Sequence, residues 1–492
     1  MVASGKNMDN KAPKYLIVTY GCQMNKNDSE RIASLLSDLG FEPTESDKEA
    51  DLILINSCSV RKSAEDRVFG RVHDYRKLKE KNPNLIIAVT GCMAGRDKKG
   101  EFKAKMGPVD LYFPTSDMVK LPRWISELRP DLVNTTDLKS DYLKIRPLRA
   151  PSSQAYVSIQ TGCNNFCTYC VVPYARGFES NRPAKDIMDE VKDLAAHGVI
   201  EITLLGQTVN SYKAPDPENF SSNNPYVIST AAERSINMSS RPQRRDLSEK
   251  ISPLHPENFR GSGRNDRGNH FAALLWEVNQ ISELKRVHWT APYPSQMSDE
   301  VIDALTLPKQ VNFLHLPVQS GSNEVLRRMN RKYTREQYLE IINKVKAKRP
   351  GIALATDIIV GFSGETEEQF QETVSLFKEV DFDISYNAQY SPRSGTLGIK
   401  LYEDDIPAAE KRRRWRVLQE LMEETALRKN QEFKDKTVNV LVEKIQDKWA
   451  SGNTDEMKLC RFPCHDPSLI GKIVPVKVTL VQEWQLMGNI VE

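Results

Sequence analysis

The sequence has 492 residues, of which 39% are hydrophobic and 27% are charged. At about 150 residues per domain this length predicts about three domains, and the composition excludes a chain that is disordered throughout. No run of about 18 apolar residues occurs, which excludes a membrane-spanning helix, and the 69 basic and 66 acidic residues nearly cancel, so overall charge does not indicate a nucleic-acid partner.

Residues 1–14 are polar and lack the apolar stretch of a secretion signal. We therefore expect a protein of the reducing cytoplasm. The eight cysteines are too few for a disulfide scaffold in a chain of this length, but they suffice for one or two metal sites.

Short apolar runs and amphipathic stretches alternate in the first hundred residues. Strands are expected at 15–20, 51–56 and 85–90, and helices at about 28–39 and 62–81. This order predicts a βαβαβ unit with a parallel sheet, which we assign to a first domain over residues 14–135.

A cysteine follows each of these three strands: Cys22, Cys58 and Cys92. Because the carboxyl ends of parallel strands meet at one edge of a sheet, where ligands bind, the three thiols are predicted to share a site although no CxxC pair links them. Small buried residues at strand ends are the alternative, since free cysteine is often buried. The spacing leaves both interpretations open.

A second group of cysteines, Cys163, Cys167 and Cys170, forms a C-x3-C-x2-C motif just after a strand expected at 155–159. Three thiolates on one loop suit a [4Fe-4S] cluster whose fourth iron is left open for a small ligand. A structural zinc site would need four closed ligands, usually in paired spacings, and no such pairs occur here. The motif therefore favours an iron–sulfur cluster over zinc.

The strand at 155–159 is the first of six in a second predicted domain, over residues 149–395. The others are expected at 201–205, 286–290, 312–316, 353–360 and 384–390, with helical stretches between them. Six βα units predict a partial (β/α)6 barrel whose active site lies at the C-terminal mouth of the strands.

Two polar loops at this mouth are predicted to contact a cofactor. Gly206 and Gln207 follow the second strand, and Gln319 and Ser320 follow the fourth. Turn chemistry alone is the alternative for such loops. Their position beside the cysteine motif favours cofactor contacts.

A polar segment at 213–267 interrupts the barrel. It holds six prolines and many Asn, Ser and Arg residues, which is typical of a disordered or loosely folded insertion. RNA contacts through Arg241, Arg244 and Arg245 are the alternative.

The C-terminal region is predicted to hold a linker helix, residues 396–429, and a small domain, residues 430–492. Residues 411–416 (KRRRWR) give the helix a basic run around Trp415; such runs are usually a solvated face, but an aromatic among cations is also typical of phosphate-plus-stacking sites. Strand-like runs at 437–442, 473–480 and 485–491 predict a small β-barrel. Cys460 and Cys464 have no partner motif, so we expect them to be structural or incidental.

Five short strings carry a resemblance to a known family. They are YGCQMN at 20–25, NSCSVR at 56–61, TGCMA at 90–94, GCNNFCTYCVVPYARG at 162–177 and LLGQTVNSY at 204–212. With them, the chain resembles the radical S-adenosylmethionine methylthiotransferase family, and most of all its branch that acts on N(6)-dimethylallyladenosine in tRNA. Residues 430–492 resemble the RNA-binding TRAM module.

The resemblance implies two [4Fe-4S] clusters. Cys163, Cys167 and Cys170 would hold the cluster that binds S-adenosylmethionine, and Cys22, Cys58 and Cys92 would hold an auxiliary cluster. S-adenosylmethionine would then serve as methyl donor to sulfur and as source of a deoxyadenosyl radical, so that a 2-methylthio group is added to the adenosine next to the anticodon. The implied partners are the tRNA anticodon loop, an electron donor protein and a sulfur donor, with the enzyme itself a monomer.

Two other functions stay open at this point. A related methylthiotransferase would act on a ribosomal-protein aspartate or on threonylcarbamoyladenosine, and an RNA-binding protein would carry structural clusters only. Three residues depart from the family pattern: Gly95, Tyr293 and Ser363. None of the three departures removes an expected cluster ligand, but the departure at Tyr293 leaves the role of that position open.

Overall fold

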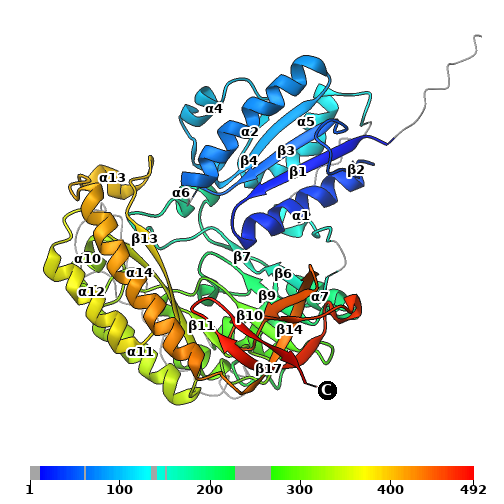
Figure 1. Ribbon diagram of the computed structural model, residues 1–492. Coiled ribbons are helices and arrows are strands. Elements are labelled where there is room, and N and C mark those ends of the chain that lie inside the picture. Colours follow the sequence, from blue (N-terminus) through cyan, green and yellow to red (C-terminus); the bar gives the residue numbers. More distant parts are fainter. Residues whose placement is uncertain (1–11, 60–61, 134–140, 150–151, 228–267, 492) are drawn as a thin grey trace, which may run out of the picture.

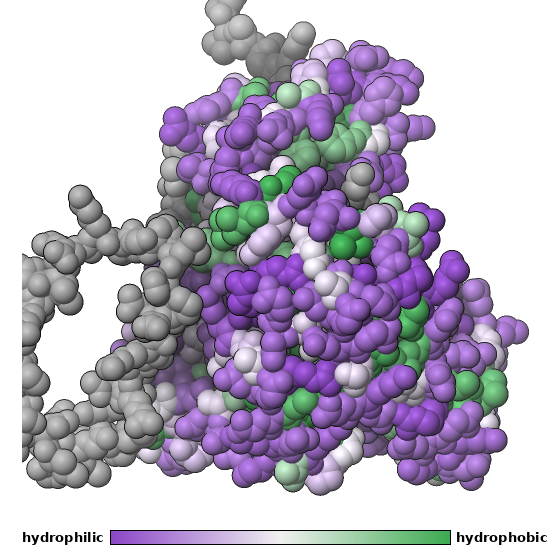
Figure 2. Space-filling view, turned by 90° about the vertical axis from the view of Figure 1, so that its left-hand side faces the viewer, coloured by the Kyte–Doolittle hydropathy of each residue, from purple (hydrophilic) through white to green (hydrophobic). Residues whose placement is uncertain are grey.

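The structure, a computed structural model, describes residues 12–59, 62–133, 141–149, 152–227 and 268–491. An N-terminal sheet domain lies at the top of Figure 1, a strand-and-helix barrel below it, and a small C-terminal β-barrel beside the lower strands. Within the described part, no helix is long and apolar enough to cross a membrane. The face in Figure 2 is mostly hydrophilic, with apolar side chains in small separate patches.

The N-terminal domain is a five-stranded parallel sheet in the order β2-β1-β3-β4-β5, as the βαβαβ pattern predicted. Its elements are β1 (Lys14–Tyr20), α1 (Gln23–Asp38), β2 (Glu42–Pro43), β3 (Leu52–Ser57), α2 (Lys62–Lys81), β4 (Ile86–Gly91), α3 (Cys92–Arg96), α4 (Glu101–Met106), β5 (Leu111–Tyr112) and α5 (Leu121–Leu128). Side chains alternate between the faces of a strand, so Leu54 packs with α1 and α5 while Ile53 and Ile55 pack with α2.

The central domain is the predicted partial barrel. Its six strands form two parallel sheets, β6-β9-β10 and β11-β12-β13, which a bridge between Val287 and Gln310 links. The strands are β6 (Gln154–Ser158), β9 (Glu201–Leu205), β10 (Arg286–Trp289), β11 (Phe313–His315), β12 (Ala353–Val360) and β13 (Ile384–Gln389), with β7 (Gln160–Thr161) and β8 (Ser180–Asn181) paired beside the first. The helices are α6 (Val172–Arg176), α7 (Ala184–Ala196), α8 (His270–Asn279), α9 (Asp299–Ala304), α10 (Asn323–Arg328), α11 (Arg335–Lys348) and α12 (Glu367–Val380).

The first part of the polar segment is folded, so the expectation of a loose insertion is wrong for residues 213–227. Phe220 is buried in the barrel core, and the buried Asn224 amide donates to the Ala273 carbonyl over 3.0 Å. Residues 228–267, including the three arginines considered for RNA contact, lie outside the described residues.

The C-terminal barrel contains two strands that its sequence pattern did not predict. Five strands close in the order β14-β15-β16-β18-β17: β14 (Thr437–Gln446), β15 (Trp449–Asn453), β16 (Leu459–Pro463), β17 (Ile473–Val481) and β18 (Leu486–Ile490). β15 carries Gly452, where a Cβ would collide with the Leu441 backbone, and Cys460 lies buried in the barrel core, consistent with a structural cysteine. The Arg286–Asp455 ion pair (3.0 Å) docks this barrel against β10.

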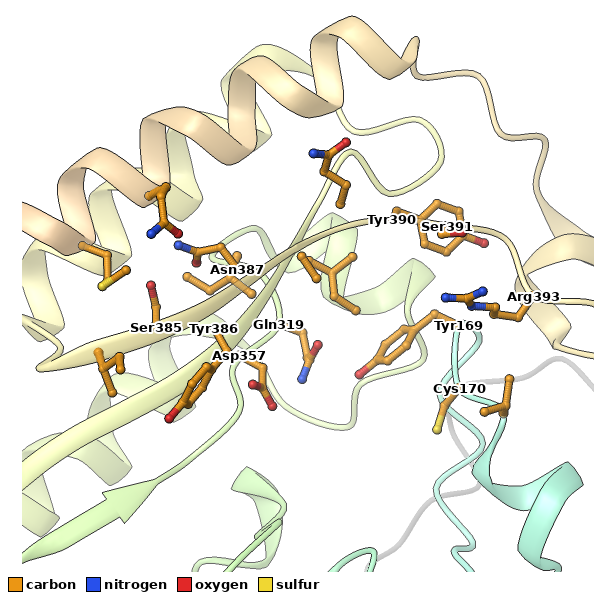
Figure 3. Close-up of a pocket in the computed structure, with 18 of the residues that line it drawn as sticks. Tyr169, Cys170, Gln319, Asp357, Ser385, Tyr386, Asn387, Tyr390, Ser391 and Arg393 are labelled. Carbon is orange, nitrogen blue, oxygen red and sulfur yellow. The ribbon is translucent and has the colours of Figure 1, made fainter. Parts of the chain in front are cut away.

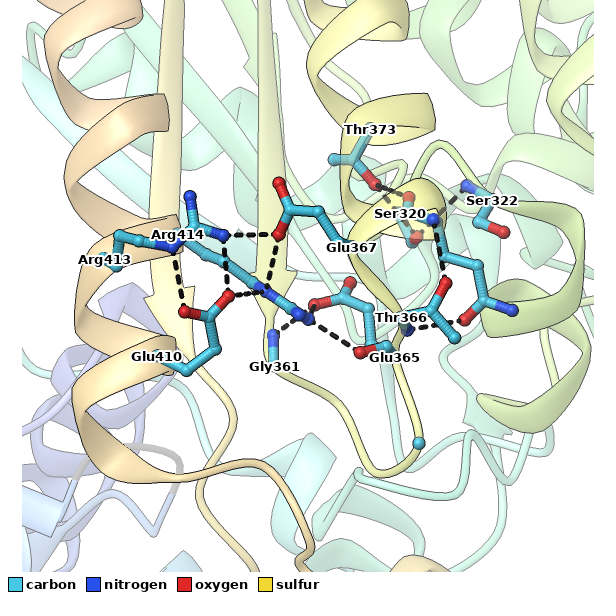
Figure 4. A network of polar contacts seen from close by, with 12 residues as sticks. Ser320, Ser322, Gly361, Glu365, Thr366, Glu367, Thr373, Glu410, Arg413 and Arg414 are labelled. Atoms are coloured by element: carbon cyan, nitrogen blue, oxygen red, sulfur yellow. Dashed lines mark hydrogen bonds and ion pairs between the residues drawn. The ribbon is translucent and has the colours of Figure 1, made fainter.

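The basic run lies on α14 (Ala408–Gln431), which follows α13 (Leu397–Leu401). Arg414 is 4% exposed and pairs with Glu365 over 2.8 Å, as Figure 4 shows. Arg413 pairs with Glu410 over 2.7 Å, and the Trp415 indole donates to the Asn387 carbonyl over 2.9 Å. Arg414 and the Trp415 indole N–H are thus used inside the fold, whereas Arg412, Arg413 and Arg416 are exposed, so RNA contact along this helix stays a prediction.

Candidate functional site

The sheet register brings the three N-terminal cysteines to one edge. Tyr20, Ser57 and Gly91 are paired neighbours at the ends of β1, β3 and β4. Cys58 and Cys92 follow directly, and Cys22 follows β1 by two residues as the N-cap of α1. The shared-site interpretation is therefore supported by backbone geometry.

The electrostatics of this edge differ from thiol to thiol. A hydrogen bond with Cys58 lowers the pKa of Cys22 to about 6, and the charge of Arg176 acts in the same direction. Burial raises the pKa of Cys92. Cys22 also lies beside the Asn25 side chain, with its Sγ 3.4 Å from Oδ1. One thiol of the set is thus readily ionised, whereas burial disfavours the thiolate of another even beside the Arg176 cation.

The second cysteine group lies on the loop between β7 and α6. Cys163 and Cys167 are buried and Cys170 is half-buried. The Thr208 hydroxyl lies 3.2 Å from the Cys163 Sγ, and the Val172 N–H donates to the Cys170 Sγ over 3.5 Å. The loop thus presents three sulfurs, and hydrogen-bonding groups lie next to two of them.

The surroundings of this loop fit an iron–sulfur cluster. Burial, with the charge of Cys167 second, raises the pKa of Cys170 to about 12, and burial raises that of Cys163. Such thiols ionise when they bind a metal. No group of three Cys, His, Asp or Glu in the described ranges is placed to hold a single metal ion; cubane ligands bind separate irons and stand farther apart.

Tyr293, whose role the sequence left open, contacts Arg331 beside this loop. The Arg331 guanidinium donates to the Cys167 Sγ over 3.4 Å and stacks 4.4 Å from the centre of the Tyr293 ring. The Tyr293 hydroxyl accepts the Lys332 N–H over 3.0 Å. Tyr293 therefore supports the arginine that faces Cys167.

A cavity of about 680 Å³ opens at the C-terminal mouth of the barrel, where the three parts of the chain meet. Its lining includes Ser59, Cys170, Gln319, Tyr386, Met422 and Trp484. In Figure 3, Tyr169 and Cys170 lie on one side, and Ser385 and Tyr386 on β13 lie opposite. The volume is in the usual range of small-molecule sites, and Tyr386 and Trp484 are each about half exposed.

The predicted cofactor contacts lie in different surroundings. Gln319 lines the cavity with a strained backbone (φ 74°). The Gln207 Oε1 is buried without a hydrogen-bond partner among the described residues, and a Cβ at Gly206 would lie 2.6 Å from the Gln160 side chain. Ser320 is fully buried, and its hydroxyl lies 3.2 Å from that of Thr373 (Figure 4), inside the fold and outside the cavity lining.

Several site residues have no signal in the sequence. Thr208 lies in the string LLGQTVNSY at 204–212, but nothing in the sequence indicates that its hydroxyl lies next to Cys163. Asp357, Tyr386 and Trp484 reach the cavity from β12, β13 and the turn before β18. Only the folded chain brings them to the cysteine loop.

Three family profiles match the chain in order. Residues 14–114 match the uncharacterized protein family UPF0004, residues 157–377 match the radical SAM superfamily, and residues 431–491 match the TRAM domain. Each match covers one of the three parts of the fold.

Curated relatives match over nearly the whole length. A tRNA-2-methylthio-N(6)-dimethylallyladenosine synthase of Thermoanaerobacter sp. (strain X514) is 40% identical over 99% of this chain and 94% of its own. Synthases of the same name from Clostridium tetani (strain Massachusetts / E88) and Moorella thermoacetica (strain ATCC 39073 / JCM 9320) are 38% and 39% identical, over 98% and 97% of this chain and 97% and 98% of their own.

Among solved structures, the radical S-adenosylmethionine methyltransferase TsrM from Kitasatospora setae has a similar fold. The TM-score is 0.51 at 14% identity, over 80% of this chain and 78% of that chain. At this identity the likeness supports the fold alone.

Proposed function

Because the chain belongs to the radical S-adenosylmethionine methylthiotransferase family of these tRNA-2-methylthio-N(6)-dimethylallyladenosine synthases, we propose that it adds a methylthio group to carbon 2 of N(6)-dimethylallyladenosine in tRNA. The observation that carries the proposal is the cavity at which the C-x3-C-x2-C loop, the N-terminal domain and the TRAM domain meet.

Cys163, Cys167 and Cys170 would hold the [4Fe-4S] cluster that the radical SAM family implies. This cluster would supply the electron that cleaves bound S-adenosylmethionine. Thr208, Arg331 and the Val172 N–H direct donors at the three sulfurs; such donors stabilise thiolate charge and tune the potential of a cluster. We propose that Gly206, Gln207 and Gln319 contact S-adenosylmethionine, and that Ser320 holds the Gln319 loop in place.

Cys22, Cys58 and Cys92 would hold a second cluster, which we propose as the site of sulfur attachment. Their supports are the shared sheet edge and the low pKa of Cys22. Ser59, one residue beyond Cys58, lines the same cavity as Cys170. A substrate in this cavity would therefore lie between the two cysteine groups.

The cavity suits a base that has left its stack. Bases in an anticodon loop are cheap to splay out, and proteins receive them on aromatic side chains. Tyr386 and Trp484 are exposed aromatics of this kind at the cavity. We propose that they stack on bases of the anticodon loop while the modified adenine enters between the cysteine groups.

The remaining expectations are part of the same proposal. They are an electron donor protein, a sulfur donor, a monomeric enzyme, a cytoplasmic location and the domain boundaries 14–135, 149–395, 396–429 and 430–492. The boundaries are supported by family matches that lie inside them, 14–114, 157–377 and 431–491.

The test is the reconstituted enzyme incubated anaerobically with reductant, S-adenosylmethionine and tRNA that carries N(6)-dimethylallyladenosine. Mass spectrometry of the nucleosides is expected to show the 2-methylthio derivative, and the Cys163→Ala variant is the inactive control. Formation of deoxyadenosine without any methylthio nucleoside would reject this substrate and favour the related methylthiotransferases.

A further inference from the structure

Arg176 is a buried cation between the two cysteine groups. It is the last residue of α6, the short helix that follows the C-x3-C-x2-C loop, and its side chain is 3% exposed. Nothing in its spacing from the cysteines assigns it a role. Its side chain contacts the N-terminal group, and the residue that follows it contacts the other group.

Toward the N-terminal group, Arg176 contacts two elements that begin at a cysteine. Its Nε donates to the Cys92 Sγ over 3.2 Å, at the start of α3. Its Nη2 pairs with the Asp28 carboxylate over 2.5 Å, on the helix that Cys22 caps. Asp28 is 1% exposed on its side chain, so this ion pair is shielded from water.

Toward the other group, the backbone next to Arg176 holds the cluster loop. The Cys163 N–H donates to the carbonyl of Gly177 over 3.2 Å. The helices α3 and α6 also touch through their backbones, because a Cβ at Gly95 would lie 2.1 Å from the Ala175 carbonyl oxygen. One short segment, residues 175–177, therefore contacts a ligand of each proposed cluster.

The ion pair between Arg176 and Asp28 differs from a purely structural ion pair. A buried Arg–carboxylate pair gains little net stability after desolvation, but Arg176 also points a third donor at a thiol. A cation beside a cluster favours its more negative, reduced state, and Asp28 opposes that effect. The balance between the charges of Arg176 and Asp28 therefore sets the electrostatic potential at the N-terminal cysteines.

We propose that Arg176 is a positioning residue that couples the two cysteine sites: it fixes their relative position and, balanced by Asp28, sets the reduction potential of the N-terminal cluster. The inference rests on the proposed function for the presence of that cluster. Its consequence is that removal of the cation and removal of the anion change this potential in opposite directions.

The test compares Arg176→Gln, Asp28→Asn and the double variant in the reconstituted full-length chain. Iron content is measured first, and then the potential of the N-terminal cluster by redox titration followed by electron paramagnetic resonance, without tRNA. Arg176→Gln is expected to lower the potential and Asp28→Asn to raise it. The double variant leaves no unpaired charge, so we expect it to fold and to bind enough iron for two clusters.

The second readout is coupling, the methylthio product formed per deoxyadenosine. We expect Arg176→Gln and the double variant to lower it at least tenfold, and Arg176→Lys, which keeps the charge, to keep the potential near that of the parent. Arg182→Gln is the matched control, because Arg182 forms an equally buried pair with Glu190 (2.5 Å) but contacts no cysteine among the described residues.

Unchanged potential and coupling in Arg176→Gln and Asp28→Asn would overturn the inference, as would shifts of the same sign or a chain that holds one cluster. If Arg176→Gln does not fold, the double variant and Arg176→Lys decide by the same measurements. Opposite shifts in a chain that makes no methylthio product would reject the proposed substrate and keep the role of Arg176.

Discussion

Replacement of Gly95 by alanine tests the contact between the two cysteine-bearing helices. Gly95 is one of the departures from the family pattern, and the close approach of α3 and α6 leaves no room for a side chain at this position. The new Cβ would lie 2.1 Å from the Ala175 carbonyl oxygen, whereas real Cβ atoms stay beyond 3.0 Å, so the backbone of α6 has to move by at least 0.9 Å.

The size of the effect follows from this displacement. Overpacking costs about 1–3 kcal/mol, and alanine in place of glycine in a helix returns about 0.8–1 kcal/mol, which leaves a net loss of about 0–2 kcal/mol. A 0.9 Å shift along the line between the helices would lengthen the Arg176–Cys92 contact from 3.2 Å to about 4 Å. Because a 1 Å misplacement can cost 10²-fold in rate, we expect coupling to fall about 10- to 100-fold.

The assay combines amide hydrogen exchange with product analysis. A multidomain chain does not unfold in one step, so local exchange of peptides spanning 92–96 and 172–176 is the direct readout. Gly70→Ala is the matched control, because Gly70 is an exposed helical glycine with nothing within 4 Å of a new Cβ. It is expected to leave coupling unchanged.

A Gly95→Ala variant that kept the exchange protection and the coupling of the parent would refute this role of the α3–α6 contact. Faster exchange in both helices with normal coupling would show that the backbone contact is structural only.

Three other variants or reactions test separate parts of the site. Cys58→Ala is expected to keep deoxyadenosine formation and lose methylthio transfer, since it damages only the N-terminal site; full transfer would reject that ligand assignment. In the metal-free chain, the alkylation rate of Cys22 should rise with pH to a midpoint near 6, because its lowered pKa leaves it a thiolate above that pH. Cys170, with a pKa of about 12, should stay protonated and react slowly. Peptide mass spectrometry measures both rates, and equal rates would contradict the difference in pKa between the two thiols. Trp484→Ala should weaken binding of the anticodon stem-loop roughly 5- to 160-fold, as the loss of one stacked base at about 1–3 kcal/mol predicts. Ile470→Ala, a change at a residue exposed on the same barrel, should bind normally in the same titration.

The sequence allowed most of the fold to be predicted, because the local signals are strong. The strands β3 and β4 are continuous apolar runs between amphipathic helices, and the residues after each parallel strand had to share an edge. β15 and β16 gave no such signal, since β15 is short and holds Ser451, Gly452 and Asn453 in one run. Such a segment becomes a strand by pairing with its neighbours.

The contacts that tune the site were less predictable, because they join residues far apart in the chain. Arg176 and Asp28 are separated by 148 positions, and Arg331 and Cys167 by 164. The basic run on α14 looked like a solvated or RNA-binding face, yet Arg414 finds Glu365, 49 positions away, and is buried. Charge patterns along a sequence do not reveal which cations are neutralised by the fold.

The most direct test of the central claim is nucleoside mass spectrometry of tRNA after reaction with the reconstituted chain, with the iron content of the same sample measured alongside. We expect 2-methylthio-N(6)-dimethylallyladenosine, formed by a protein that holds two clusters. Active S-adenosylmethionine cleavage with unmodified N(6)-dimethylallyladenosine, or transfer by a protein with iron for one cluster only, would contradict it.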